Sequence, residues 1–556
     1  MSLIFRMAVK GIMFLFGRRK RRRSSGDNGE YPRIPAERLN DAAVDGDLER
    51  VVRQIRGVLG ENDDFTIRRF LVFGRYPAAM FFYPNMIDMT TLNSEILKPL
   101  MYGPPHAERL PENGEELWDF LLESTLYHSD VRSETLVAKV VSDLLRGQTA
   151  VIIEGVAQAL LLGTRAIEKR SIDQPATEQV IRGPREGFIE LLSTNISLIR
   201  YRLQTPDLRV KTMEVGRRSQ SKVAICYMHG ITNPELVKEI TRRLDLIDVD
   251  AILDSGYLEQ FIEDNQMSPF PQVQYTERPD KVVANLLEGR VALIVDGSPL
   301  ALVVPTVFSQ FYQTVEDYTE RFLMMSAIRW ARLIALVFSL VFPSLYVAII
   351  SFNPELIPTE FAVAVAGGRA GVPFPAIVEV LVIEISMEVL REATIRLPQQ
   401  VGGALSIVGV LVVGQAAVAA GFASPITVVI IALTTIGSFA TPAYNAALAL
   451  RLLRFPLIVL AGIFGLYGVM IGLILIANHL LSLKSFGVPY LSPLVPGSSQ
   501  GMKDLFLRGP FWWMSTRPDF LHPSDKTRIS DRTVEELKKP PNNVLEPADI
   551  ENTRKR

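Results

Sequence analysis

Charged and apolar positions are distributed unevenly along the chain. From residue 40 to about residue 321 the charges are dense and of both signs. From residue 333 to residue 477, in contrast, long stretches contain no charge. An uncharged apolar stretch of about 20 residues has the length that a helix needs to cross a membrane. The pattern therefore predicts a multidomain protein in which a soluble domain precedes a membrane domain.

In the soluble part, apolar runs rich in β-forming residues alternate with helical patterns. The predicted strands lie at 65–73, 78–83, 149–155, 222–230 and 291–305. The predicted helices lie at 41–59, 115–126, 133–146 and 234–245. Asp296 to Pro299 form a turn signal inside the last run, which predicts a hairpin there. The alternation predicts an α/β domain over residues 40–320, with lobes of about 40–180 and 181–320.

Four runs in the second part have the length and composition of membrane-spanning helices. They lie at 329–352, 401–420, 424–450 and 455–478. A fifth segment, 373–392, is apolar but contains several carboxylates. We therefore predict an all-α polytopic membrane domain of four to five helices over residues 329–480.

Arginines flank the first and the last of these runs. They are Arg321, Arg329 and Arg332 before the charge-free part of the first run, which begins at Leu333, and Arg451 and Arg454 before the last run. Because basic residues concentrate on the cytoplasmic side of membranes, we expect these ends and the soluble domain to be cytoplasmic. The side of the C-terminus depends on whether 373–392 crosses fully or is re-entrant. The basic residues of the polar tail, 481–556, favour the cytoplasmic side.

The N-terminal extension, residues 1–39, combines a short apolar run with a basic cluster. The cluster, Arg18 to Arg23, follows the apolar run, whereas a secretory signal has its positive charges first. One interpretation is an interfacial anchor that meets anionic lipid. The other is a disordered extension. A polar segment with two prolines, 26–35, is predicted to link this extension to the soluble domain.

Composition excludes several functional classes. The 59 Lys+Arg residues balance the 60 Asp+Glu residues, so nothing indicates a nucleic-acid partner. The single cysteine, Cys226, and five scattered histidines form no metal-binding pattern. Phosphate-binding glycine loops and nucleophile motifs are missing from the sequence as well. We therefore predict a non-enzyme with no metal and no cofactor.

The apolar segment 373–392 contains an unusual row of carboxylates. Glu384, Glu388 and Glu392 recur every four residues and share one helix face, whereas Glu379 faces elsewhere. Because isolated charges inside a bilayer are costly, these groups must be hydrated or paired. One hypothesis is a cation-attracting vestibule, or a carboxylate ring in an oligomer. The alternative is an amphipathic packing helix in which Arg391 pairs locally.

Two stripes of small side chains lie on the predicted spans. The first, the candidate pore lining, comprises Gly402, Ser406, Gly409, Val413 and Ala416. Such a stripe leaves room for a lumen when several copies surround an axis, or lets helices pack closely. The second stripe comprises Ala461, Gly465, Gly468 and Gly472. It indicates helix packing only.

Several long motifs resemble a known family. "DSGYLEQFIEDNQMSPFPQVQYTERPDKVVANLLEGRVALIVDGSPLALVVPTVF" (254–308) is similar to the A subunit of the GerA-type spore germination receptors. So are "RGPREGF" in the soluble part, "GVPFPAIVEVLVIEISMEVLREATIRLP", "SIVGVLVVGQAAV", "RLLRFPLIVLAGIFGLYG" and "SFGVPYLSP" in the second part. Together they cover most of the chain from about residue 50 to residue 515, in the order of the family.

The resemblance implies a multi-pass protein of the spore inner membrane. It also implies two partners, a transporter-like B subunit that binds the germinant and a lipoprotein C subunit. The A subunit is expected to contact membrane lipid, to form homo-oligomers and to release monovalent cations. A paralogous stage V sporulation protein shares this architecture and stays an alternative.

Two other functions are compatible with the sequence. The chain could be a non-conducting scaffold whose lobes relay a signal from the partner subunit. A secondary transporter would need paired broken helices in two repeats, and the sequence offers one candidate, at Pro373 and Pro375. The sequence identifies neither the germinant nor the number of subunits.

Overall fold

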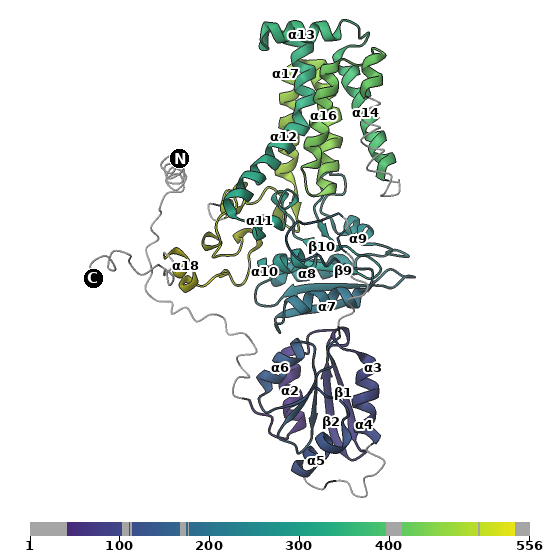
Figure 1. Ribbon diagram of the computed structural model, residues 1–556, viewed down its shortest axis with the longest axis vertical. Helices are drawn as coiled ribbons and strands as arrows, with labels where there is room; N and C mark the ends of the chain where they lie inside the picture. Colours follow the sequence, from purple (N-terminus) through teal and green to yellow (C-terminus); the bar gives the residue numbers. More distant parts are fainter. Residues whose placement is uncertain are drawn as a thin grey trace, which may run out of the picture.

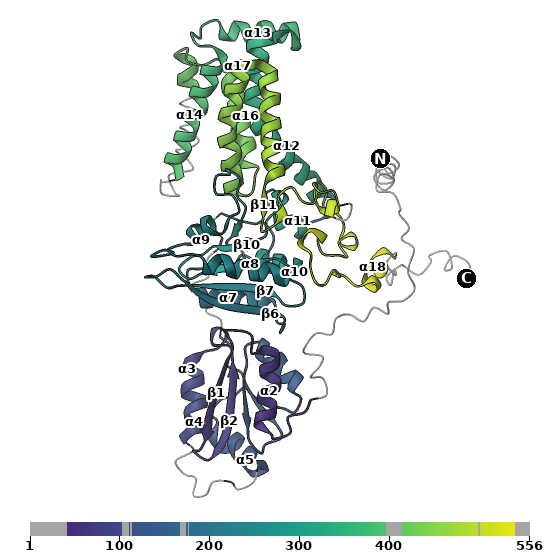
Figure 2. The same ribbon diagram turned by 180° about the vertical axis from the view of Figure 1, so that it is seen from behind.

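The computed structural model describes residues 42–102, 111, 114–166, 174–175, 177–395, 414–498 and 501–539. Two α/β lobes and a helix bundle follow one another along the longest axis of the molecule (Figure 1). Seen from behind, the C-terminal segment, drawn in yellow, lies beside the second lobe and the base of the bundle (Figure 2). The soluble and the apolar parts are therefore separate layers that meet at the second lobe.

Lobe 1 is built around a five-stranded antiparallel sheet. Its strands are β1 (Thr66–Val72), β2 (Tyr76–Phe82), β3 (Val131–Glu134), β4 (Thr149–Ile153) and β5 (Ala159–Leu162), in the order β1-β2-β4-β5-β3. Helices α2 (Leu48–Leu59) and α6 (Val137–Leu145) cover one face. The other face is covered by α3 (Met89–Thr91), η3 (Leu92–Leu97), α4 (Lys98–Tyr102), α5 (Gly114–Phe120) and η4 (Leu121–Thr125). The short η2 (Pro84–Met86) adds Met86 to the core under α2 and α6.

Lobe 2 has the same plan. Its strands are β6 (Leu208–Val215), β7 (Ser221–Met228), β8 (Gln274–Thr276), β9 (Val291–Val295) and β10 (Ala301–Val304), in the order β6-β7-β9-β10-β8. Helices α7 (Leu192–Arg202) and α10 (Pro279–Glu288) cover one face, and α8 (Pro234–Asp245) and α9 (Ser255–Ile262) cover the other. Counted within each lobe, both sheets have the strand order 1-2-4-5-3.

The two lobes are an internal duplication. "AKVVSDLLRGQTAVIIEG" (138–155), which runs from α6 through β4, aligns without gaps with "DKVVANLLEGRVALIVDG" (280–297), from α10 through β9. The final glycine of each segment has a positive φ, 80° at Gly155 and 87° at Gly297, as the turn into the next strand requires. Sequence and topology therefore agree that one unit occurs twice.

The duplication extends to one helix cap. The backbone N–H of Leu48, the first residue of α2, donates to Glu154 Oε2 at 3.0 Å. In lobe 2, the N–H of Leu192, the first residue of α7, donates to Asp296 Oδ1 at 3.1 Å. Glu154 and Asp296 occupy equivalent positions in the two repeats. An acidic side chain at this position therefore stabilises the N-terminus of the first helix in each lobe.

A buried polar cluster joins the lobes. Arg200 of α7, 2% exposed, donates to the Asp64 carboxylate at 2.5 and 2.6 Å. The Nη2 atom that binds Asp64 also donates to Asn62 Oδ1 at 3.0 Å. Because Asp64 and Asn62 belong to lobe 1, the ion pair fixes lobe 2 against it.

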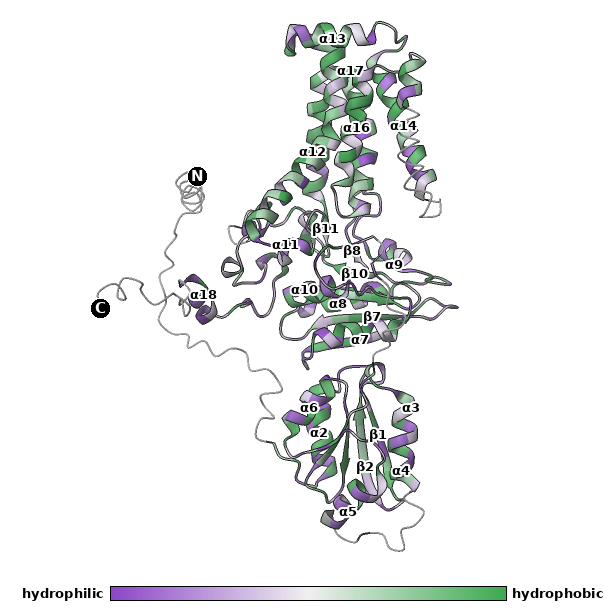
Figure 3. Cartoon of the chain, viewed as in Figure 1, coloured by the Kyte–Doolittle hydropathy of each residue, from purple (hydrophilic) through white to green (hydrophobic). Residues whose placement is uncertain are grey.

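The helix bundle consists of apolar elements that extend away from lobe 2. They are α12 (Phe322–Phe352), α13 (Thr359–Arg369), α14 (Ala376–Ile395), α16 (Pro425–Phe439) and α17 (Tyr444–Ser482), with η6 (Pro354–Leu356) before α13. Among the described residues, α12 and the 39-residue stretch of α17 are, by length and composition, apolar enough to cross a membrane. In α17, however, this stretch is folded back on itself. Hydrophobic residues, drawn in green, dominate α12, α16 and α17, whereas α14 and α13, which lies across the far end of the bundle, carry hydrophilic residues as well (Figure 3).

Helix α17 is a hairpin. Gly465 has φ 62° and ψ −142°, a conformation outside the helical region that glycine alone adopts easily. A Cβ on Gly472 would lie 2.4 Å from Leu457 Cδ1, whereas a continuous helix would place these two residues about 22 Å apart. The predicted single span 455–478 is therefore wrong, because the chain reverses at Gly465 and returns toward lobe 2.

Other predicted elements are confirmed or corrected. The strands at 65–73, 78–83, 149–155 and 222–230 and the hairpin at 291–305 are present, as is helix 234–245. The predicted helix 41–59 begins only at Leu48. The predicted helix 133–146 begins only at Val137, because residues 133 and 134 are the end of β3. The predicted span 424–450 ends at Phe439, because Ala440 to Ala443 turn the chain before α17 starts.

The C-terminal tail packs on lobe 2. Its elements are β11 (Lys484–Ser485), β12 (Val488–Pro489), η7 (Gly501–Asp504), η8 (Phe511–Trp513), η9 (Asp519–Leu521) and α18 (Asp531–Lys538). Ser485 Oγ accepts a hydrogen bond from the Thr306 N–H at 3.0 Å, and Tyr490 OH donates to Pro271 O at 2.7 Å. The described tail therefore lies at the same end of the bundle as the soluble lobes.

Candidate functional site

The predicted carboxylate row lies on α14, and its first member is paired inside the bundle. Arg454 of α17 places Nη1 2.8 and 2.9 Å from the two carboxylate oxygens of Glu384. Glu384 is 1% exposed and Arg454 2% exposed. The sequence pattern predicts that Arg451 and Arg454 lie at the cytoplasmic end of the span 455–478. The structure places both inside the first arm of α17, because the helix starts already at Tyr444.

The second member, Glu388, meets two arginines. Arg391 Nη1 lies 2.6 Å from Glu388 Oε1, and Arg451 Nε lies 3.5 Å from the same oxygen. The local Arg391 contact is the one that the packing alternative expects. Glu392, the third member, is exposed at the surface of α14.

Glu379 is turned away from this row, as the helical geometry predicted. It is 1% exposed and accepts a hydrogen bond from the backbone N–H of Ser424 at 2.5 Å. Arg369 of α13 places Nε 3.3 Å from its other oxygen. Glu379 therefore connects α13 and the start of α16 to α14.

The outward face of α14 is apolar. Val378, Val382, Ile385 and Val389, spaced every three or four residues, are all exposed. Helix α14 thus presents charge to its neighbours inside the bundle and a hydrocarbon stripe to its surroundings. A stripe of this kind suits lipid or a second apolar surface.

The candidate pore stripe falls largely on residues outside the described ranges. Gly402, Ser406, Gly409 and Val413 lie in that segment. Ala416, the described member, is exposed. The pore assignment therefore stays a prediction.

The second small-residue stripe lies inside the α17 hairpin. Ala461 is fully buried, and Gly465 forms the reversal. A Cβ on Gly468 would lie 2.0 Å from Leu460 O, and Gly472 faces Leu457 in the same way. These glycines let the two arms approach closely, so the stripe serves packing within one chain.

A buried charge cluster joins the base of α12 to the tail, and sequence reasoning missed it. Asp317 lies in α11 (Glu316–Thr319) and is 0% exposed. Arg329 donates through Nε to Asp317 Oδ2 at 3.1 Å and through Nη1 to Asp504 Oδ1 of the tail at 2.8 Å. Arg332 pairs with the other oxygen of Asp317. We call these four residues the α12 joint.

The buried carboxylate of Asp504 depends on the donors that surround it in the joint. Burial raises the pKa of Asp504, and the guanidinium of Arg329 opposes that shift. Tyr318 OH donates to Asp504 Oδ2 at 2.5 Å. From the sequence, Arg329 and Arg332 are expected only to flank a membrane span. No local pattern indicates their pairing with Asp504, because that residue lies far away in the sequence.

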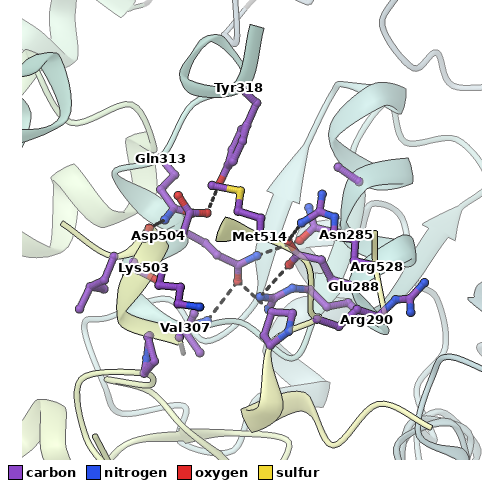
Figure 4. Close-up of a pocket in the computed structure, with 18 of the residues that line it drawn as sticks. Asn285, Glu288, Arg290, Val307, Gln313, Tyr318, Lys503, Asp504, Met514 and Arg528 are labelled. Atoms are coloured by element: carbon purple, nitrogen blue, oxygen red, sulfur yellow. Dashed lines mark hydrogen bonds and ion pairs between the residues drawn. The ribbon is translucent and has the colours of Figure 1, made fainter. Parts of the chain in front are cut away.

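A cavity of about 270 Å³ lies between lobe 2, α11 and the tail. Asp504, Lys503 and Gln313 approach it from one side, and Asn285, Glu288 and Arg528 approach it from the other (Figure 4). Asp504 thus belongs both to the cavity wall and to the α12 joint. Among the described residues, no group of His, Cys, Asp and Glu is arranged to hold a metal ion.

Fold and site together define a protein in which a duplicated α/β domain is clamped to a bundle of apolar helices. The chain belongs to the GerA family of spore germination proteins. The family described as Bacillus/Clostridium GerA spore germination protein matches residues 53–520.

Individual relatives are similar over most of their length. Spore germination protein KA of Bacillus subtilis (strain 168) is 41% identical over 93% of this chain and 95% of its own. Spore germination protein GerLA of Bacillus cereus is 39% identical over 87% of this chain and 97% of its own. An uncharacterized membrane protein, YfkQ of Bacillus subtilis (strain 168), is 45% identical over 71% and 77%.

One solved structure is also similar. It is the N-terminal domain of the A subunit of the Bacillus megaterium spore germinant receptor GerK3. That chain is 31% identical and is covered to 98%, against 48% of this chain, with a TM-score of 0.37.

Proposed function

We propose that this chain is the A subunit of a nutrient germinant receptor in the spore inner membrane. In this proposal several copies surround an axis and release monovalent cations when a transporter-like B subunit binds the germinant. A lipoprotein C subunit completes the receptor. Membership of the GerA family is the observation on which the proposal rests.

The arrangement of the bundle supports a multi-pass topology. Helix α12 leaves the soluble lobes, and both ends of the α17 hairpin contact residues at their edge, Ala443 through Phe311 and His479 through Ser268. The tail packs on lobe 2. The lobes and the described tail then share one side of the membrane. Arg321, Arg329 and Arg332 lie at this end of α12, so the positive-inside rule makes it the cytoplasmic side.

Conduction, in this proposal, takes place between copies and not through one bundle. Inside one copy Glu384 and Glu388 are paired with arginines, so their charge is largely neutralised. The exposed apolar stripe of α14 and the small-residue stripe from Gly402 to Ala416 are the surfaces proposed to pack around an axis. In this proposal the half-buried Glu388 and the exposed Glu392 act as the cation vestibule, whereas Glu384, the third predicted member, stays buried against Arg454.

The α12 joint favours a second candidate, a non-conducting scaffold. Because Asp504 and Asp317 hold Arg329 from two directions, movement of lobe 2 or the tail is transmitted directly to α12. A relay needs only this connection and no pore. A paralogous sporulation membrane protein that amplifies ion release would use the same parts.

Flux measurements test the proposal. The purified chain is reconstituted into liposomes with its partner subunits, and potassium release is recorded at low and high salt after addition of germinant. The vestibule hypothesis expects lower flux for the Glu388→Gln/Glu392→Gln variant, an effect that shrinks as salt screens the charges. Glu384 is left unchanged, because its loss would leave the buried Arg454 unpaired. Glu360→Gln, an exposed change on α13, is the matched control.

The outcomes separate the candidates. Wild-type release that depends on germinant, together with crosslinked oligomers, supports the channel. A receptor that assembles normally but shows no release from any liposome supports the scaffold. Equal flux of wild type and the double variant at low salt rejects the vestibule, while leaving the channel itself testable through the stripe at Gly409.

A further inference from the structure

The cavity between lobe 2 and the tail has an excess of positive charge. Arg290 and Arg528 share one carboxylate, Glu288, at 3.5 and 3.6 Å. Lys503 makes no ion pair with any residue that the structure describes. The other charges of the wall have partners elsewhere. These pairs are Asp280 with Arg278, Lys281 with Glu178, Asp504 with Arg329, Arg517 with Asp525 and Asp519 with Lys526. Uncompensated cations therefore face the cavity.

Arg290 is the most informative of these cations. Its side chain is 2% exposed and lines the cavity. Nη1 donates to Pro305 O at 2.6 Å and to Gln310 Oε1 at 3.0 Å, but Nε has no acceptor in the described structure. Burial lowers the pKa of Arg290, which Glu288 offsets only in part. A buried donor without an acceptor is costly, so an anion placed here would stabilise the protein.

The duplicated lobe provides an internal comparison. In the aligned segments Gln148 of lobe 1 occupies the position of Arg290, and Arg146 occupies that of Glu288. Gln148 is only partly buried. The fold of the repeat therefore does not require a buried arginine at this position. The charge occurs in the lobe where the tail closes a cavity over it.

The remaining wall determines the kind of anion. Trp513, Met514, Phe520 and Val307 supply apolar surface, and the Arg290 guanidinium lies 5.8 Å from the centre of the Phe520 ring. We propose that this cavity is a binding site for a small organic anion, a carboxylate or phosphate ester with a short apolar body. Because Asp504 forms part of both the wall and the α12 joint, a bound anion acts next to the connection between the tail and α12.

Calorimetry on the full chain in phosphatidylcholine nanodiscs tests the site. The probes are butyrate and phenyl phosphate, with neutral butyramide as the isosteric control, in a chloride-free buffer. We expect saturable binding of at least one anion and roughly tenfold weaker binding of butyramide, because the amide loses the charge-assisted hydrogen bonds.

Variants place the binding in this cavity. Lys503→Gln/Arg528→Gln changes a half-buried and an exposed residue of the wall and should weaken anion binding roughly tenfold without lowering the melting temperature. Arg242→Gln, on the exposed face of α8, should change nothing. No saturable binding of either anion, equal binding of butyramide, or an unchanged double variant would overturn the proposal. Loss of the signal in phosphatidylglycerol nanodiscs would assign the site to a lipid headgroup and overturn a soluble ligand.

Discussion

Glu384 and Arg454 form an ion pair that is almost completely buried between α14 and α17. One guanidinium nitrogen lies within 2.9 Å of both carboxylate oxygens. Removing two such charges from water is costly, and the pair is stable only because each partner neutralises the other. It therefore acts as a specific connection between two apolar helices, where hydrophobic contact alone would leave their register undetermined.

We expect the loss of one partner to be far more damaging than the loss of both. Glu384→Gln or Arg454→Met leaves a buried charge unpaired and should cost about 3–5 kcal/mol. The double variant should recover most of that stability, because no charge remains buried. Thermal unfolding of the purified chain in detergent measures the difference, with Glu360→Gln as control. Additive losses in the double variant would show that the two residues do not interact.

The α12 joint should fail in two distinguishable ways. Asp317→Asn leaves Arg329 and Arg332 without their shared carboxylate and should destabilise the base of α12 by about 3–5 kcal/mol. Asp504→Asn removes only the tail side of the clamp, so we expect the tail to be cleaved faster by protease while the lobes stay folded. Limited proteolysis followed by mass spectrometry measures this. Glu535→Gln on exposed α18 is the control. Equal rates of tail cleavage in Asp504→Asn and Glu535→Gln would contradict the clamp.

The reversal at Gly465 should be destabilised by any residue that has a side chain. Its backbone conformation is strained for any side chain, and a Cβ would lie 3.0 Å from the Phe352 ring. We expect Gly465→Ala to cost about 1–3 kcal/mol. Gly367→Ala, on helical α13 with nothing within 4 Å of the new Cβ, should be neutral or slightly stabilising. A chain in which both variants melt like wild type would exclude the hairpin.

Glu259 should make lobe 2 less stable as pH rises. Burial raises the pKa of this carboxyl to about 8, with smaller contributions from Glu263 and Asp254. The folded state therefore keeps a proton that the unfolded state has already released. The resulting stabilisation is complete below the unfolded pKa near 4.5 and is lost as pH rises toward 8. We expect stability to fall by about 1–2 kcal/mol between pH 5 and pH 8, since partial solvent contact reduces the full effect.

Substitution isolates this carboxyl from all others. Glu259→Gln mimics the protonated form, so its melting temperature should depend less on pH and should exceed that of wild type near pH 8. Glu235→Gln on the exposed surface of α8 should retain the wild-type slope. Parallel pH profiles of wild type and Glu259→Gln would contradict the assignment.

Local patterns in the sequence determined much of this protein. Alternation of apolar residues located most strands, charge-free runs located the bundle, and four-residue spacing placed Glu384 and Glu388 on one face of α14 and Glu379 on another. The repeated segments at 138–155 and 280–297 are also legible in the sequence alone. These features depend on the backbone period and on solvent, which act on neighbouring residues.

Only the tertiary structure decided which distant groups meet. Arg454 follows Glu384 by a long stretch of chain, and Asp504 follows Arg329 by a longer one, so no local period could connect them. The run 455–478 is uniformly apolar, and hydropathy gives no signal for a reversal of the chain. The reversal depends on the backbone conformation of Gly465 and on the close contact of Gly472 with Leu457. Pairing energies depend on distance in the folded state, and the chain path that sets those distances results from packing over the whole molecule.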